Sequence, residues 1–360
     1  MQLRIPGPTP CPDEVLEAMT KQMINHRGKE FHELLHRITD QLKGFFQTKG
    51  DVFILTGSGT GGMEAAVVNT LSPGDRVLSV SIGFFGDRFA DIAQQYGAEV
   101  NRLGFEWGSA ADPDTVRRAL KADSPMKAML VTHNETSTGV TNDLASLSAV
   151  AKEFDLLLLV DGVSSVGSIN LPVDDWQCDV VVTASQKGWM TPPGLAMVSV
   201  SQKAWQANKQ AKMPRYYWDF GKAKRFLEEK GETPWTPAIP VFFALAVALD
   251  MVEQETLPKV FARHARVAQA ARDGIRSLGL SLFPDKACAS NTITAVKAPG
   301  DLDVKRLLQI LREEHSVILS GGQQKLDGKI FRIGHLGLVT EGDMTEVISA
   351  LQAALPRAQR

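Results

Sequence analysis

The chain has 360 residues, of which 44% are hydrophobic and 22% are charged, and its formal net charge is −2. These values are typical of one large or two medium globular domains, and they exclude the strongly basic balance that nucleic-acid binding favours. Three scattered cysteines match no metal-binding spacing, and the longest apolar run, at 156–160, is too short to cross a membrane. We therefore expect a cytoplasmic protein with no metal, no nucleic-acid partner and no membrane contact.

The predicted elements begin with two amphipathic helices, at 12–19 and 30–46, after which strands and helices alternate. The predicted strands lie at 51–56, 76–81, 98–103, 127–133, 156–162, 179–184 and 195–201. The helices among them lie at 61–71, 87–97, 114–122 and 144–154. Nearly continuous apolar strands that alternate with helices are typical of a mostly parallel sheet that is covered on both faces. The pattern thus predicts an α/β fold with seven strands.

The pattern changes after about residue 240. The remaining predicted elements are helices at 240–255 and 260–279, a strand at 292–298, a helix at 302–314, strands at 317–322 and 329–335, and a helix at 340–355. This order indicates a smaller α+β domain, and the Pro-rich stretch at 232–240 suits a boundary. We divide the chain into an N-terminal segment (1–20), a large domain (21–240) and a small C-terminal domain (241–360).

The stretch "TGSGTGG" at 56–62 lies between a predicted strand and a predicted helix. Glycines let the backbone approach an anion, and the start of a helix presents free N–H groups. Gly57, Gly59 and Gly62 also match the dinucleotide pattern G-x-G-x-x-G, which needs an acid near the end of the next strand. That strand ends in serine, and Asp75 precedes it. The residues favour a single phosphate, with a plain turn and helix cap as the alternative.

Two charged residues follow strands that should be buried. Asp161 comes directly after an apolar run, where an unpaired acid is costly. It is either a cap or structural ion pair, or a fixed negative charge that faces a cationic ligand atom. Lys187 follows "DVVVTASQ". A desolvated lysine has a lowered pKa and can act as a nucleophile, whereas the alternative is an exposed lysine in a turn.

Two further groups of candidate cofactor-binding residues follow predicted strands. The polar stretch "THNETSTG" at 132–139 offers hydrogen-bonding side chains or a helix cap, and Phe84 and Phe85 follow the strand at 76–81. Taken together, these features fit one cofactor. Pyridoxal phosphate needs a phosphate cradle, a lysine for its aldehyde and an acid for its pyridinium nitrogen, and an aromatic ring commonly stacks on it.

The motifs "SGTGGMEA", "GFFGDR", "HNETSTGV", "LLLVDGVSSVG" and "SQKGWMTPPG" make the chain similar to the class V aminotransferases. Within them it most resembles the alanine–glyoxylate and serine–pyruvate (serine–glyoxylate) group, from "PGPTP" to "FRIGHLG". The resemblance implies the fold of aspartate aminotransferase (fold type I), pyridoxal 5′-phosphate and a homodimer. It also implies a ping-pong transfer of an amino group from alanine or serine to glyoxylate or pyruvate.

The resemblance implies roles for single residues. Lys187 matches the lysine that forms a Schiff base with the cofactor, Asp161 the partner of the pyridine nitrogen, and Arg332 the arginine that binds the substrate carboxylate. Thr136 matches a residue near both cofactor and substrate. The other implied cofactor contacts are Ser58, Gly59, Thr60, Phe85, Val163 and Gln186.

The chain departs from some relatives in "WTPAIP". Trp235 and Ala238 stand where relatives have tyrosine and threonine that reach the partner subunit's phosphate, so Thr236 is the remaining candidate donor. Asn25 and His26 either face substrate or are structural.

Three alternative functions stay open. One is another amino donor, such as a phosphonate amine; a second is cysteine desulfuration, which Gln186 and a structural Cys288 argue against. The third is a non-catalytic partner subunit that retains the fold. No second arginine stands out for a distal carboxylate, which favours small donors over aspartate or glutamate.

Overall fold

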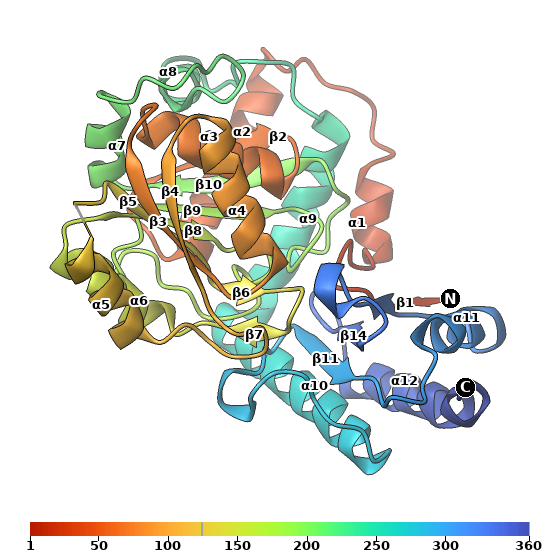
Figure 1. The fold of residues 1–360 in the computed structure, drawn as a ribbon. Helices are drawn as coiled ribbons and strands as arrows, with labels where there is room; N and C mark the ends of the chain where they lie inside the picture. The colour runs from red at the N-terminus through yellow and green to blue at the C-terminus, as the bar shows by residue number, and fades with distance from the viewer. Residues whose placement is uncertain (124, 360) are drawn as a thin grey trace.

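The computed structural model describes residues 1–123 and 125–359, in which a large sheet lies between two layers of helices (Figure 1). The sheet has seven strands in the order β2-β10-β9-β8-β5-β3-β4. Only β10 runs antiparallel to its neighbours, so the predicted mostly parallel seven-stranded sheet is confirmed. The strands are β2 (Asp51–Thr56), β3 (Arg76–Ser81), β4 (Glu99–Gly104), β5 (Ala128–Thr132), β8 (Leu157–Asp161), β9 (Val180–Ala184) and β10 (Leu195–Val200).

Each face of this sheet is buried beneath its own set of helices. Because side chains alternate along a strand, Leu158 and Val160 pack on one face while Leu157 and Leu159 pack on the other. The first face is covered by α2 (Lys29–Phe46), α5 (Pro113–Ala122), α6 (Leu144–Glu153) and α9 (Ile239–Glu255). The second is covered by α3 (Gly59–Thr70), α4 (Phe84–Gln95), α7 (Gln202–Asn208) and α8 (Phe220–Lys230).

The C-terminal part forms a separate hydrophobic cluster around a three-stranded sheet in the order β11-β14-β13 (Figure 1). Its strands are β11 (Ile293–Lys297), β13 (Ser320–Gly321) and β14 (Ile330–Gly334), and its helices are α10 (Leu257–Ser277), α11 (Val304–Glu314) and α12 (Glu341–Ala354). Helix α9, by contrast, packs against α1 (Asp13–Ala18) and α2. The division of the chain at residues 20 and 240 stays a prediction.

The N-terminal segment joins the two parts of the molecule. Strand β1 (Gln2–Leu3) pairs with β12 (Val317–Ile318), and Gly334 N donates to Arg4 O over 2.7 Å. Five residues later, Thr9 N donates to Gln186 O over 3.1 Å, at the end of the large sheet. The chain therefore runs from the small sheet to the loop that carries Lys187.

Several short elements differ from the sequence-based expectation. Helices α7 and α8 and the hairpin of β6 (Asn134–Glu135) and β7 (Val140–Thr141) were not predicted, because they are short or highly charged. The strand predicted at 317–322 is two strands, since β12 pairs with β1 and β13 pairs with β14. Among the residues that the structure describes, no helix is long and apolar enough to cross a membrane.

Candidate active site

The predicted site residues gather mainly at one edge of the large sheet. Strands β2, β3, β5, β8 and β9 are parallel, so the loops after their carboxyl ends open at the same edge. This edge is where open α/β sheets bind ligands. Arg332 reaches the same region from β14, because its guanidinium donates a hydrogen bond to the backbone of the loop after β5.

The loop between β2 and α3 has the geometry of an anion cradle. Ser58 is the N-cap of α3, and its hydroxyl accepts from Gly61 N over 3.4 Å. A Cβ atom on Gly59 would lie 2.7 Å from Val163 Cγ2, so only glycine allows this close approach. Thr60 Oγ1 accepts from Arg88 over 3.5 Å. The free amides of the first turn of α3 and the two hydroxyls suit a phosphate group.

Asp161, the last residue of β8, is a buried carboxylate without a cation in contact. It is 4% exposed, and its Oδ1 accepts from Val163 N over 3.0 Å. Its Oδ2 makes no hydrogen bond to the described residues. Burial is the main reason why the pKa of Asp161 is raised to about 7, and the negative charge of Glu135 adds to it. A carboxylate with a free oxygen in this setting fits a protonated ring nitrogen.

Lys187 lies in the loop after β9, with its amine directed at the N-terminal segment. The residue as a whole is half-buried, and its Nζ donates to Pro6 O over 2.6 Å. Desolvation lowers the pKa of Lys187 to about 8, against the opposing effect of Asp161. Gly7 leaves room for the lysine, since a Cβ there would lie 2.6 Å from Nζ. The arrangement gives an amine that loses its proton more readily than an exposed lysine.

Arg332 is a buried guanidinium whose partners are all neutral. It is 5% exposed, and its Nε donates to Gly321 O over 2.9 Å. Its Nη1 donates to Thr136 O over 3.1 Å and to Gln323 Oε1 over 3.2 Å. Burial lowers the pKa of Arg332 to about 10. Because no carboxylate within the described residues forms a salt bridge with this cation, the site fits an anionic ligand.

The other predicted residues are placed as follows. Phe85 stands in the first turn of α4, with the Arg88 guanidinium 4.8 Å from its ring centroid. Thr136 is buried and its hydroxyl donates to Ser164 Oγ over 3.0 Å. The Oε1 atom of Gln186 is buried and has no hydrogen-bond partner in the part of the chain that the structure describes. An unsatisfied buried amide of this kind points to a missing polar ligand.

Three predicted residues lie on the surface or near it. Thr236 is exposed and makes no hydrogen bond with the described residues, so its role as a donor depends on a second subunit. Asn25 is exposed and its Oδ1 accepts from Arg27 N over 3.0 Å, which is a turn contact. His26 is half-buried, and its role stays open.

The sequence-based reasoning missed three groups at this edge. Pro6 O holds the Lys187 amine, Arg88 packs over Phe84 and Phe85, and Glu135 is completely buried beside the start of α4. An acid inside the otherwise uncharged motif "NETSTG" was a visible signal. Two of its hydrogen bonds come from Phe85 N and Gly86 N, about 50 residues earlier in the chain, and the sequence could not reveal these donors.

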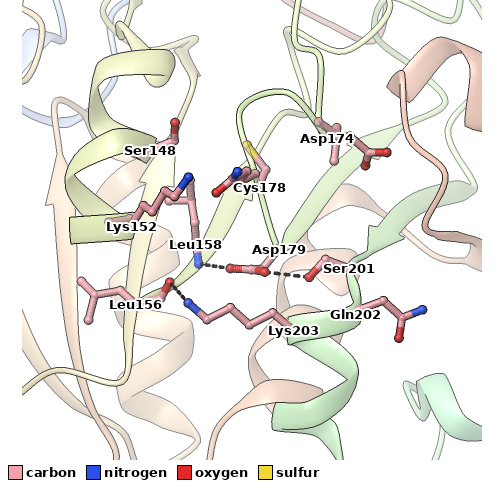
Figure 2. A pocket seen from close by; sticks show the side chains of 13 residues that line it. Ser148, Lys152, Leu156, Leu158, Asp174, Cys178, Asp179, Ser201, Gln202 and Lys203 are labelled. Atoms are coloured by element: carbon pink, nitrogen blue, oxygen red, sulfur yellow. Dashed lines mark hydrogen bonds between the residues drawn. The ribbon is translucent and has the colours of Figure 1, made fainter. Parts of the chain in front are cut away.

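A second hollow of about 300 Å³ lies at the opposite edge of the sheet (Figure 2). There Asp179 accepts from Leu158 N over 2.9 Å and from Ser201 Oγ over 2.6 Å, and Lys203 Nζ donates to Leu156 O over 2.9 Å. These bonds tie the amino ends of β8 and β9 to α7, and both oxygens of Asp179 are used. The hollow is therefore built around structural contacts.

Comparison with known proteins agrees with this geometry. Residues 3–330 match the family model described as aminotransferase class-V. The chain is 44% identical to a protein of Anabaena cylindrica named soluble hydrogenase 42 kDa subunit, over 99% of this chain and 93% of that protein. It is 37% identical to the L-aspartate–glyoxylate aminotransferase of Paracoccus denitrificans, over 94% and 86% of the two chains. Identity is also 37% to the serine–glyoxylate aminotransferase of Methylorubrum extorquens, over 98% and 90%.

The three-dimensional comparison gives the same result. The crystal structure of an alanine–glyoxylate aminotransferase from Nostoc sp. superposes with a TM-score of 0.94 at 31% identity, over 98% of this chain and 94% of that chain. The fold is that of the fold type I aminotransferases.

The chain belongs to the class V aminotransferase family, and it is a transaminase that depends on pyridoxal phosphate. The resemblance noted in the sequence is thereby confirmed. No group of three or more His, Cys, Asp and Glu side chains that could hold a metal ion occurs in residues 1–123 and 125–359.

Proposed function

We propose that this transaminase moves an amino group from a small amino acid, alanine or serine, to glyoxylate or pyruvate by a ping-pong mechanism. The observation that carries the proposal is Arg332, a buried cation hydrogen-bonded only to neutral oxygens. A substrate carboxylate supplies the missing negative charge and accepts from the free N–H groups of Nη2. The two aminotransferase relatives and the solved structure described above differ in the donor they are named for and share glyoxylate, which supports glyoxylate as the acceptor.

Lys187 and Asp161 are proposed as the catalytic pair. Pyridoxal phosphate supplies an aldehyde that takes up the amino group and a ring that accepts electrons from the α-carbon. Asp161 would keep a proton at the ring nitrogen, because the residue is buried and its Oδ2 accepts no hydrogen bond from the described chain. Lys187 Nζ would take the proton from the substrate α-carbon and return it to the cofactor carbon that had carried the aldehyde, and its lowered pKa of about 8 suits a base that works near neutral pH.

The remaining predicted residues are proposed to bind the cofactor without reacting. Ser58, Gly59 and Thr60 would hold the phosphate at the start of α3, and Gln186 would donate to it through Nε2. Phe85 and Val163 would enclose the ring, and the Thr136 hydroxyl would reach its phenolic oxygen. Bulky, rigid neighbours of this kind exclude water from the reacting atoms.

A small donor is proposed over a dicarboxylate. Arg88 also lies at this edge, but its guanidinium is engaged with the Phe84 and Phe85 rings and with Thr60. The relative from Paracoccus denitrificans is named for aspartate, so aspartate is the informative competitor. The test is a donor screen with glyoxylate as acceptor. Parallel double-reciprocal lines with alanine or serine support the proposal, and a higher kcat/KM with aspartate overturns it.

We also propose a cytoplasmic homodimer. Tyr216 and Tyr217, which are 69% and 42% exposed, stack on Trp235 with ring centroids 4.8 and 5.9 Å apart. Tyr217 also donates to Thr56 O over 3.3 Å, next to the phosphate cradle. An exposed aromatic cluster at this place suits contact with a second copy, which would bring Thr236 to the partner's phosphate.

The alternative noted in the sequence, a non-catalytic partner subunit, is set against the family assignment. Its one support is that the relative with 44% identity is named a hydrogenase subunit. The two candidates differ in one simple measurement. An active transaminase changes the absorbance of its bound cofactor when alanine or serine is added, whereas a non-catalytic subunit keeps its spectrum.

A further inference from the structure

The first turn of α4 is capped by side chains from a distant loop. The first three amides of a helix lack partners within the helix. Here Phe84 N donates to Ser137 Oγ, and both Phe85 N and Gly86 N donate to Glu135 Oε2, each over 3.0 Å. The helix has no cap of its own, since its N-cap residue is a glycine. The loop after β5 thus provides hydrogen-bond acceptors for the first amides of α4, the helix that follows β3.

The space around this cap is filled. A Cβ atom on Gly83 would lie 2.6 Å from both Glu135 Cδ and Ser137 Oγ. The backbone of Gly83 is extended, with φ of 172°, so its glycine is explained by this approach and not by a left-handed conformation. Gly83, the first residue of "GFFGDR", and Glu135, the acid of "NETSTG", are therefore in close contact.

Glu135 has no basic partner, and burial raises the pKa of its carboxyl while hydrogen bonds from Ser137, Gly86 and Phe85 oppose that rise. It is 0% exposed, and its Oε1 accepts from Ser137 N over 3.0 Å and from Ser137 Oγ over 2.6 Å. With Phe85 N and Gly86 N on the other oxygen, the carboxylate receives four hydrogen bonds. No lysine or arginine of the described chain forms a salt bridge with it. Four donors and the positive end of a helix stabilise the negative charge in place of a cation.

We propose that Glu135 and Ser137 are positioning residues, which fix the first turn of α4 and thereby hold Phe85 and Arg88 at the cofactor site. The inference rests on the proposed role of Phe85 as the residue that encloses the cofactor ring. Without the carboxylate, two buried amides would lose their acceptor and the turn would open. The aromatic ring would then lose its fixed place, because Phe85 carries one of those amides.

The test is hydrogen exchange of the cofactor-free protein, followed by mass spectrometry of the peptide over 82–92. In Glu135→Gln the carboxamide offers one oxygen in place of two, so it can accept from one pair of donors only. We expect exchange in this peptide to rise roughly 10- to 100-fold, since each lost bond is one to a charged acceptor. Ser137→Ala should give a smaller rise. Asp303→Asn, which alters the N-cap of α11, is the matched control and should leave the peptide unchanged.

The second readout is affinity for pyridoxal phosphate. We expect the Kd to rise about tenfold in Glu135→Gln, with a weaker circular dichroism band of the bound cofactor, and to stay unchanged in Asp303→Asn. Should Glu135→Gln fail to fold, Gly83→Ala takes its place, because its methyl group displaces the same cap. Unchanged exchange at 82–92, or faster exchange with wild-type cofactor affinity, overturns the proposal. Neither readout involves an amino acid, so a wrong donor assignment leaves the test intact.

Discussion

Replacing Arg332 with lysine tests the proposed carboxylate site. Lysine keeps the positive charge but lacks the several N–H donors of the planar guanidinium. Arg332 uses Nε and both N–H groups of Nη1 to hold Gly321 O, Thr136 O and Gln323 Oε1, which leaves the two N–H groups of Nη2 for substrate. A lysine has three N–H donors on one atom and cannot both keep these bonds and bind a carboxylate in bidentate fashion. Because lysine keeps the positive charge and can still donate once, the change removes about one charge-assisted bond, worth about 1.5–3 kcal/mol.

Since about 1.4 kcal/mol corresponds to a factor of ten, Arg332→Lys should raise KM about 10- to 100-fold. The rise should be similar for the amino acid and for glyoxylate, since both carry the carboxylate, and affinity for pyridoxal phosphate should stay nearly unchanged. Steady-state kinetics with alanine, serine and glyoxylate measure this. Arg263→Lys is the control, because Arg263 pairs with Glu255 within the described chain. Wild-type KM values in Arg332→Lys would refute the assignment.

Three further predictions follow from the same site. Lys187→Ala should abolish turnover, and borohydride should no longer link the cofactor to the protein; labelling of another lysine would contradict this. Asp161→Asn should stabilise the cofactor-free protein at pH 8 by about 1–4 kcal/mol, because a carboxyl whose pKa rises from 3.8 to about 7 on folding loses stability as pH rises through that range. Thermal unfolding should show no such gain at pH 4, and an equal gain at both pH values would be inconsistent with a raised pKa. Sedimentation should find a dimer, and a fully active monomer would remove that claim.

Most strands and helices of the fold could be predicted from the sequence, because their patterns of apolar residues are local. Runs such as 156–162 and 179–184 are almost wholly apolar because both faces of their strands are covered, so β8 and β9 were predicted to within about one residue. The hairpin of β6 and β7 has two residues on each side and carries no periodic signal. Leu319 separates β12 from β13, and the two pair with different strands, which an unbroken apolar run cannot reveal.

The candidate site could be proposed from the sequence where a charged residue stands at the end of a buried strand. Asp161 and Lys187 were singled out in this way, because a buried ionisable group is costly without a partner, and their catalytic roles stay predictions. Glu135 was not singled out, since its Oε2 accepts from amides about 50 positions earlier in the chain. Nor could the sequence show that Pro6 O accepts a hydrogen bond from the Lys187 amine, because every residue has a backbone carbonyl.

The most direct test of the proposed transamination is a single-turnover experiment on the purified protein with pyridoxal phosphate bound. Alanine or serine is mixed with the protein in the absence of a keto acid, and the absorbance of the bound cofactor is followed. We predict that its near-visible band disappears with either donor at a rate well above that with aspartate, and that glyoxylate restores it. A spectrum that stays unchanged with both donors, or one that responds to aspartate alone, would contradict the proposed function.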